Sequence, residues 1–431
     1  MPGTDIMTHS PLTLRADPSR TVIRPFDLED PSSFAVEGHS RAQRIVDRVL
    51  TLDAEALDAE LGRVVNSLEE RHLEVEGVLM RRFQEVAGLT IDRNALNREQ
   101  SLLIGAYFSE EYSFEAAALF NPSIVLHTDQ SGLPADTIRF GMSLRGIGEG
   151  HVSSVTFRVG TWGPGGQVTI DTPSATVVSP RIEEIEGDGD DAVTRIHCPG
   201  ARDLSEVVLF PVTASQRQGI EDLRLVRFVE DDGQVLFLGT YTAFSGSSAR
   251  SEMLRAKDFR TFEMRAMRGS AAATKGMALF PRRIGGRYAM LSRQDNENVW
   301  LLFSDDLYHW DGGEKLLCPK YFWEFVQIGN CGSPIEIEEG WLVLTHGVGS
   351  ARNYCIGACL LDKDDPSKVL GRMTLPLVHP SAKERDGYVP NVVYSCGAMV
   401  HDRTLLLPYG VADSFAKFAS VQLDDLLAVL E

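Results

Sequence analysis

Gly340-Trp-Leu-Val-Leu-Thr-His346 is a glycine turn followed by a strand. The same pattern recurs in Gly233-Gln-Val-Leu-Phe-Leu-Gly239 and Gly286-Arg-Tyr-Ala-Met-Leu-Ser292, and weaker copies begin at Gly166 and Asp402. Repeats of about 50 residues with several strands each are typical of a β-propeller, whose blades pack on one another. We therefore expect an all-β fold, a five-bladed β-propeller. The alternative is a β-sandwich joined to a separate domain, which does not predict the repeat.

The sequence before the repeat has a helical period instead. Apolar residues recur there at spacings of three and four: Leu57, Leu61, Val64, Leu68, Val75, Leu79, Phe83 and Val86. This spacing predicts amphipathic helices, and Asp53 is placed as a helix N-cap. We expect an α-helical N-terminal region at residues 38–119, followed by the propeller as catalytic domain at residues 120–431. Residues 1–37 are predicted to form an arm that is either disordered or wrapped over another surface.

The apolar stripes of the helical region need a partner. They either cap the β body that follows or form a contact between copies of the chain. The second alternative predicts a homo-oligomer assembled through the helical region.

Composition excludes several classes of protein. The chain carries 42 basic and 61 acidic side chains, a formal net charge of −19, which repels phosphodiester backbones and anionic lipid. The sequence contains neither an apolar signal-peptide core nor a run long enough to cross a membrane. The 6 cysteines form no zinc-binding pattern. We expect a cytoplasmic protein with reduced cysteines that needs no cofactor or metal and binds neither nucleic acid nor membrane.

Polar residues near strand ends can meet at the centre of a propeller even when they are far apart in sequence. Such candidates are Glu221-Asp222 with Arg224, His346, Asn121, and Tyr409 with Asp413. Each has a structural alternative: a surface ion pair, a hydrogen-bonded histidine or a turn residue. No phosphate-binding glycine loop, GxSxG elbow or HExxH motif is present. Carboxylates with Arg, His, Asn and Tyr are typical of sugar binding and glycosidic-bond cleavage.

A series of motifs lies in order between residues 120 and 431: Asn121-Pro122, Gly219-Ile-Glu-Asp-Leu-Arg224, Leu279-Phe-Pro281, Trp323-Glu324, Gly340-Trp341-Leu, His346-Gly347, Leu360-Leu-Asp-Lys-Asp-Asp-Pro366, Pro390-Asn391-Val-Val and Tyr409-Gly-Val-Ala-Asp413. Together they resemble glycoside hydrolase family 130, the β-mannoside phosphorylases and β-mannosidases. The resemblance implies a five-bladed propeller and a β-manno-oligosaccharide substrate, and it says little about the first 110 residues.

The resemblance also implies roles for individual residues. Asp222 matches the catalytic acid of an inverting reaction, whose proton reaches the glycosidic oxygen through a hydroxyl of the mannose. Asp413 matches the carboxylate that binds the non-reducing mannose, and Asn121 and Arg145 match sugar contacts. The expected substrate-binding set is completed by Arg224, His346, Asn391 and Tyr409.

In the phosphorylases of this family, inorganic phosphate lies among Arg, Lys and His side chains. His346 matches the His, Arg250 and Arg268 are candidates for the arginines, and Gln327 stands where the Lys is expected. A neutral amide supplies a weaker hydrogen bond than an ammonium group and no compensating charge. This substitution favours water over phosphate as the nucleophile.

The main hypothesis is therefore an inverting β-mannosidase. Its water would need a carboxylate base, for which Glu149, Glu252 and Glu297 are candidates. The alternative is a β-mannoside phosphorylase that takes inorganic phosphate and releases mannose 1-phosphate. A more remote alternative is a propeller that binds carbohydrate without cleaving it.

Overall fold

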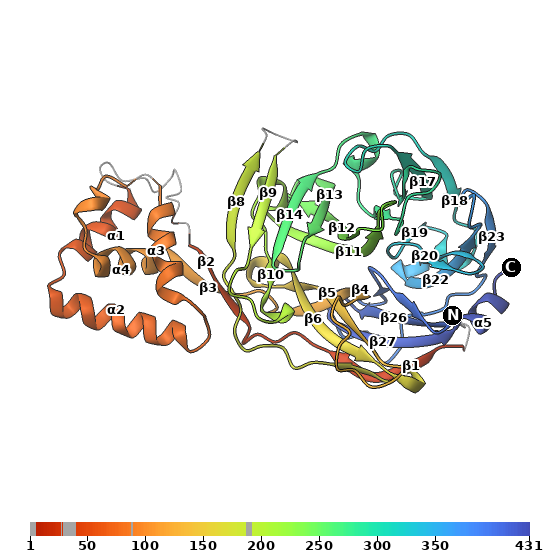
Figure 1. Ribbon diagram of the computed structural model, residues 1–431, viewed down its shortest axis with the longest axis horizontal. Coiled ribbons are helices and arrows are strands. Elements are labelled where there is room, and N and C mark those ends of the chain that lie inside the picture. The colour runs from red at the N-terminus through yellow and green to blue at the C-terminus, as the bar shows by residue number, and fades with distance from the viewer. Residues whose placement is uncertain (1–5, 27, 29–39, 88, 187–191) are drawn as a thin grey trace. The chain divides into compact units, whose positions relative to one another are not determined.

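The chain forms two compact units. A computed structural model describes residues 6–26, 28, 40–87, 89–186 and 192–431 (Figure 1). One unit, the helical unit, comprises Pro18–Ser113 and Ser174–Ser179. The other, the β unit, comprises Met1–Asp17, Phe114–Pro173 and Pro180–Glu431.

The described residues of the helical unit form four α-helices and an antiparallel sheet of 2 strands: β2 (Thr21–Pro25), α1 (Arg41–Leu50), α2 (Ala54–Glu69), α3 (Val75–Glu85), α4 (Arg98–Tyr107) and β3 (Ser109–Ser113). The expected N-cap is confirmed, because the Asp53 side chain accepts a hydrogen bond from the Ala56 backbone N–H. Ser40 and Asn97 cap α1 and α4 in the same way. Apolar side chains such as Leu57, Leu61 and Leu79 form the core between the helices.

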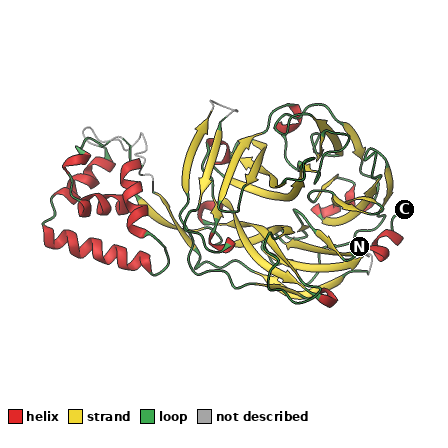
Figure 2. Ribbon diagram, in the orientation of Figure 1, coloured by secondary structure: helices red, strands yellow, loops and turns green. Residues whose placement is uncertain are grey.

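Strands dominate the β unit (Figure 2). The largest sheet has 11 strands: β4 (Ala118–Leu126), β5 (Ile138–Ile147), β6 (Ser153–Trp162), β7 (Val168–Ile170), β8 (Arg181–Glu186), β9 (Val193–His197), β10 (Val208–Leu209), β11 (Gly219–Val229), β12 (Val235–Phe244), β13 (Ala249–Ala256) and β14 (Thr261–Ala266). A second sheet has 4 strands: β15 (Ala278–Leu279), β16 (Tyr288–Ser292), β17 (Val299–Ser304) and β18 (Glu314–Leu317).

Two further sheets of 5 strands follow. The first contains β19 (Gln327–Asn330), β20 (Ile335–Ile337), β21 (Gly340–Val348), β22 (Tyr354–Leu361) and β23 (Val369–Arg372). The second contains β1 (Thr8–Leu14), β24 (Val393–Tyr394), β25 (Met399–His401), β26 (Thr404–Val411) and β27 (Phe415–Gln422), and the short helix α5 (Leu423–Ala428) comes after it.

The structure corrects the expected fold class, an all-β five-bladed propeller preceded by a helical region. The strands do not fall into five equal blades, because the sheets of the described chain have 5, 11, 4, 5 and 2 strands and none closes into a barrel. The first described helix begins at Arg41, after two strands, and the first of these strands, β1, pairs with β27 near the end of the chain. The helical segment is thus an insertion after a strand of the β unit.

Short bridges between strands explain why the repeat was misleading. Gly219 of β11 pairs with Ser153 of β6 in parallel, and this contact joins two groups of antiparallel strands into the 11-stranded sheet. Apolar side chains then pack neighbouring sheets face to face, in a sandwich-like manner. Phe140 and Met142 of β5, for example, share one core with Leu406 and Phe418 of the last sheet.

The predicted arm, residues 1–37, lies partly outside the described residues. Its described part contributes β1 to the β unit and β2 to the helical unit. In β1, the His9 ring nitrogen Nδ1 lies 3.1 Å from the Tyr409 hydroxyl.

Candidate active site

Four of the residues expected at the site have left-handed backbones. The φ angles are 48° for Asn121, 52° for Asp222, 63° for Asn391 and 49° for Asp413. Non-glycine residues rarely adopt this conformation, and when they do they are concentrated at functional sites. The backbone is therefore irregular where the sequence places its candidate residues.

β-bulges produce two of these conformations. The pairing of β4 with β5 shifts between Phe120 and Ser123, and that of β11 with β12 shifts between Glu221 and Arg224. A bulge bends its strand and redirects a side chain. Asn121 and Asp222 lie in these two bulges, and the Asn121 amide Nδ2 donates to Asp222 Oδ1 at 2.7 Å.

Arg145 of β5 connects both carboxylates of the Glu221-Asp222 pair. Its Nη2 donates to Glu221 Oε1 at 2.8 Å, and its Nη1 lies 3.5 Å from Asp222 Oδ1. Burial raises the pKa of Asp222, but the nearby guanidiniums of Arg145 and Arg224 outweigh this effect and leave the pKa below its usual value. The carboxyl group of Asp222 is thus ionised in the free protein at neutral pH.

A cluster of three buried basic side chains and a partly buried tyrosine lies beside Asp222. We call it the cation cluster; it consists of Arg224, Arg293, His346 and Tyr394. The Arg224 Nη2 donates to the Tyr394 hydroxyl at 2.8 Å, and the Tyr394 ring lies 4.9 Å from the His346 ring. Arg293 Nη1 in turn donates to His346 Nε2 at 3.0 Å.

Both guanidiniums of the cation cluster are buried, and neither has a carboxylate hydrogen-bond partner among the residues that the structure describes. Arg224 is 3% and Arg293 9% exposed. Within the described residues, Arg224 donates to the Asp222 carbonyl oxygen and to Tyr394, and Arg293 donates to His346. Burial, reinforced by the charges of Arg293 and Arg224, lowers the pKa of His346 well below its usual range, so its imidazole is neutral. Such a group of desolvated cations fits an anion.

Gln327, at the start of β19, contributes to this cluster in an unexpected way. In the amide orientation that satisfies its neighbours, its side-chain oxygen accepts a hydrogen bond from Arg293 Nη1 at 2.8 Å. The glutamine therefore orients the arginine. Two positions along β19, Gly329 leaves room for the cluster: a Cβ there would lie 2.7 Å from His346 Nε2.

Asp413 is electrostatically linked to the same site. Burial and the Asp222 charge raise its pKa to about 6, against the opposing effects of Arg145 and Arg352. Of the two candidate aspartates, Asp413 therefore holds a proton more readily in the free protein. Asn391 shortly precedes Tyr394 in the chain. The carbonyl oxygen of Asn391 accepts a hydrogen bond from the backbone N–H of Tyr354 at 2.9 Å.

Three other expected residues have their contacts elsewhere. Arg250 Nε donates to Glu252 at 2.9 Å, and Arg268 forms an ion pair with Asp306 at 3.7 Å. Tyr409 is 3% exposed and packs in an apolar core, with its hydroxyl at His9. These partners lie outside the cation cluster.

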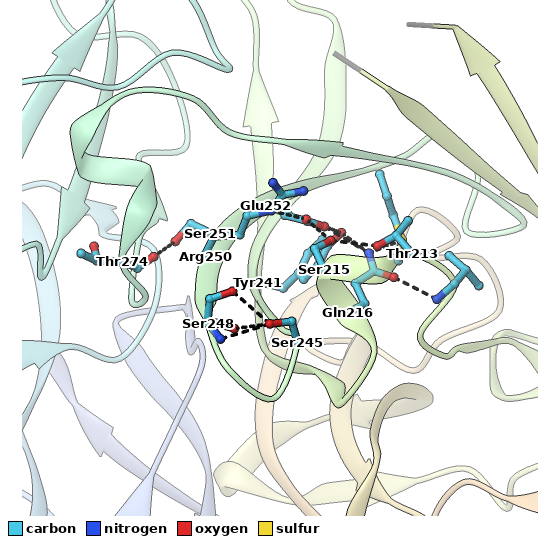
Figure 3. A network of polar contacts seen from close by, with 12 residues as sticks. Thr213, Ser215, Gln216, Tyr241, Ser245, Ser248, Arg250, Ser251, Glu252 and Thr274 are labelled. Carbon is cyan, nitrogen blue, oxygen red and sulfur yellow. Dashed lines mark hydrogen bonds and ion pairs between the residues drawn. The ribbon is translucent and has the colours of Figure 1, made fainter. Parts of the chain in front are cut away.

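Glu252, one of the candidate bases, is fully occupied by a polar network (Figure 3). Its carboxylate accepts from Ser215 Oγ at 2.7 Å, Gln216 Nε2 at 3.1 Å and the Tyr241 hydroxyl at 2.6 Å, besides Arg250. A carboxylate with this many donors is a structural anchor. The other two candidates, Glu149 and Glu297, have exposed side chains.

Sequence reasoning missed Arg293, Tyr394 and Lys275. Arg293 directly follows β16, and Tyr394 lies in β24, so the rule that polar residues near strand ends converge could have found both. Lys275 is exposed, and its charge helps to lower the pKa of Asp222. It follows a segment without periodicity, and we see no signal in the sequence that would have identified it.

Known proteins resemble this chain over the part that carries the site. A family model described as beta-1,4-mannooligosaccharide phosphorylase matches residues 201–431. A 1,2-beta-oligomannan phosphorylase from Thermoanaerobacter is 34% identical over 228 residues, 52% of this chain and 75% of that protein. The chain belongs to glycoside hydrolase family 130. The resemblance seen in the sequence motifs is thereby confirmed, and the protein is an enzyme of a family that acts on β-mannosides.

Other family 130 relatives match over shorter stretches. A beta-1,4-mannooligosaccharide phosphorylase from Ruminococcus albus is 34% identical over 182 residues, 39% of this chain and about half (54%) of that protein. The solved structure of a β-1,2-mannobiose phosphorylase from Listeria innocua, in complex with β-1,2-mannobiose, has a TM-score of 0.53 at 21% identity. The match covers 74% of this chain and 93% of the Listeria protein, and it shows that the two share a fold.

None of the helices in the described ranges combines the length and hydropathy that crossing a bilayer requires. No group of three or more His, Cys, Asp and Glu side chains in these ranges is arranged to hold a metal ion.

Proposed function

We propose that the protein is an inverting β-mannoside phosphorylase that cleaves manno-oligosaccharides with inorganic phosphate. The observation that carries this proposal is the cation cluster, in which two buried guanidiniums lack carboxylate hydrogen-bond partners within the described residues. Arginine binds phosphate oxygens through paired N–H donors, and two arginines can do so without a lysine. Relatives named as phosphorylases support the same activity.

This proposal replaces the hydrolase that Gln327 had favoured. Gln327 would favour hydrolysis if it took the place of a phosphate ligand and left the pocket short of positive charge. Its oxygen instead accepts from Arg293, which keeps that guanidinium in place. A hydrolase also needs a base for its water, and of the three candidate glutamates one is saturated with donors and two are exposed.

The reaction that follows is a direct displacement. A phosphate oxygen attacks the anomeric carbon from the face opposite the leaving sugar, the bond from that carbon to the glycosidic oxygen breaks, and the oxygen takes a proton supplied by Asp222. Inversion of a β-mannoside then gives α-mannose 1-phosphate and a sugar shortened by one unit.

Bound phosphate also helps to protonate the acid. In the free protein the positive charges of Arg145 and Arg224 keep the pKa of Asp222 low. A phosphate dianion held by Arg224 and Arg293 offsets part of this charge, so the pKa of Asp222 rises as the complex forms. Asp222, which must donate the proton, therefore becomes protonated more readily when phosphate is bound.

The test is the dependence of the rate on phosphate in variants of Arg293. Purified protein is incubated with β-1,2- and β-1,4-linked mannobiose at increasing phosphate, and mannose 1-phosphate is measured. Arg293→Gln should raise the KM for phosphate by at least tenfold, because a charge-assisted contact contributes about 1.5–3 kcal/mol. Arg293→Lys should retain part of the affinity.

Arg63→Gln is the matched control, since Arg63 is an exposed residue of α2 and pairs with Glu60. It should leave the KM for phosphate unchanged. An Arg293→Gln variant with the wild-type KM for phosphate would overturn the proposed location of the phosphate.

A further inference from the structure

Tyr388 is a strongly exposed aromatic residue beside the candidate active site. Its side chain is 75% exposed, yet its ring is held in place by the ring of His151, at 5.7 Å and an interplanar angle of 30°. One face of the tyrosine ring is therefore supported by the histidine, while much of the side chain remains open to solvent. Isolated exposed apolar residues are common, but a supported ring is pre-ordered for a ligand.

The backbone around Tyr388 is fixed next to Asp413. The N–H of Val389 donates to the carbonyl oxygen of Ala412 at 3.1 Å. On the other side of the tyrosine, a Cβ at Gly387 would collide with Ala412 and lie 3.1 Å from the Cβ of Ser414. Ala412 and Ser414 flank Asp413 in the chain, so both neighbours of Tyr388 lie against the turn that carries this aspartate.

His151 lies in the turn that follows the strand of Arg145. It ends the turn Glu149–His151, which follows β5, the strand that carries Arg145. Arg145 pairs with Glu221 and lies 3.5 Å from Asp222. The stacked rings thus connect two loops, one next to Asp413 and the other next to the strand of Arg145.

We propose that the Tyr388 ring, supported by His151, is a stacking platform for a pyranose ring of the oligosaccharide beyond the two sugars that flank the cleaved bond at Asp222 and Asp413. A pyranose presents a face of C–H groups that packs on an aromatic ring, while its hydroxyls remain at the edge in water or at polar groups. Tyrosine suits this contact because its ring is large and rigid and its hydroxyl is polar. The inference rests on the proposed function and adds to it a preference for substrates longer than the disaccharide.

Binding measured without turnover separates this inference from the proposed reaction. Full-length protein with Asp222→Asn is titrated by calorimetry with β-linked mannobiose, mannotriose and mannotetraose, without phosphate. If the Tyr388 ring is such a platform, an oligosaccharide long enough to reach it should bind more tightly than mannobiose. Tyr388→Ala should weaken this binding by about 2- to 12-fold, the effect of an aromatic contact of about 0.5–1.5 kcal/mol, and should reduce the advantage of the longer sugar.

Conservative variants and a control distinguish stacking from a general loss of structure. Tyr388→Phe and Tyr388→Trp should keep the length preference, and His151→Ala should weaken it by removing the support of the ring. Tyr107→Ala changes an exposed aromatic residue of the helical unit, 44% exposed, and should have no effect. Equal affinities of the parent and Tyr388→Ala for every sugar would overturn the platform, whereas failure of the parent to bind any β-mannoside would overturn the proposed function instead.

Discussion

At the scale of single residues, the charges around Asp222 decide which protonation state its carboxyl group holds. Arg145 and Arg224 lower its pKa, while burial and the charge of Asp222 itself raise the pKa of Asp413 to about 6. The sequence placed both aspartates among the candidates, since each belongs to a recognisable motif. It could not indicate their protonation, because this depends on arginines that the fold brings together from distant strands.

Replacing Asp222 by Asn should remove the proton donor while preserving the shape of the side chain and a partner for Asn121. We expect kcat for a β-mannoside to fall by roughly 10²- to 10⁴-fold, the usual contribution of a general acid. Asp231→Asn, at an exposed carboxylate of the turn between β11 and β12, is the control and should leave kcat unchanged. Near-normal turnover by Asp222→Asn would exclude this residue as the acid.

Asp413 should make stability depend on pH in a defined direction. Because its pKa is raised from 3.8 to about 6 in the folded protein, ionising it costs stability, and this cost grows as pH rises from about 4 to about 6. Asp413→Asn cannot ionise, so its melting temperature relative to wild type should increase across this range and then level off. Thermal unfolding measured at pH 4.5, 5.5, 6.5 and 7.5 tests the sign; a difference that is constant or falls with pH would contradict it.

At the scale of elements, periodicity predicted the strands better than the bends within them. The strands expected after Gly233, Gly286 and Gly340 are confirmed as β12, β16 and β21. The bulges at Asn121 and Asp222 were not predicted, because a pattern of period two specifies which face a side chain takes only while the strand remains regular. These bulges orient Asn121 and Asp222. The orientation of these two side chains was therefore the part of the site that the sequence predicted least well.

Gly329 of β19 offers a test of how an element positions the cation cluster. Gly329→Ala would place a methyl group against the His346 ring and 3.2 Å from Arg293 Cδ, which forces both side chains to move. We expect the KM for phosphate to rise several-fold in steady-state assays. Gly62→Ala, in α2, is the control: apart from its chain neighbours and the backbone of its own helix, its Cβ would meet no atom within 4 Å, and it should leave phosphate kinetics unaltered. A wild-type KM in Gly329→Ala would show that the strand does not set the geometry of the cluster.

At the scale of the whole molecule, the sequence predicted a mainly β body and a helical segment, but not how the sheets join. The period of the repeat predicts one blade of a propeller for each copy. Pairing between Gly219 and Ser153 merges two strand groups, and β1 joins the sheet of the last strands from the other end of the chain. Such long-range pairings leave no local pattern, so they could not be predicted from periodicity.

The central claim is that phosphate, not water, attacks the anomeric carbon. The most direct measurement is cleavage of a β-linked mannobiose in ¹⁸O-labelled water containing unlabelled phosphate, with the products analysed by mass spectrometry. Phosphorolysis predicts mannose 1-phosphate without ¹⁸O, in an amount equal to the second sugar released, and no product when phosphate is left out. Free mannose carrying ¹⁸O at the anomeric position, formed at the same rate with and without phosphate, would contradict the account.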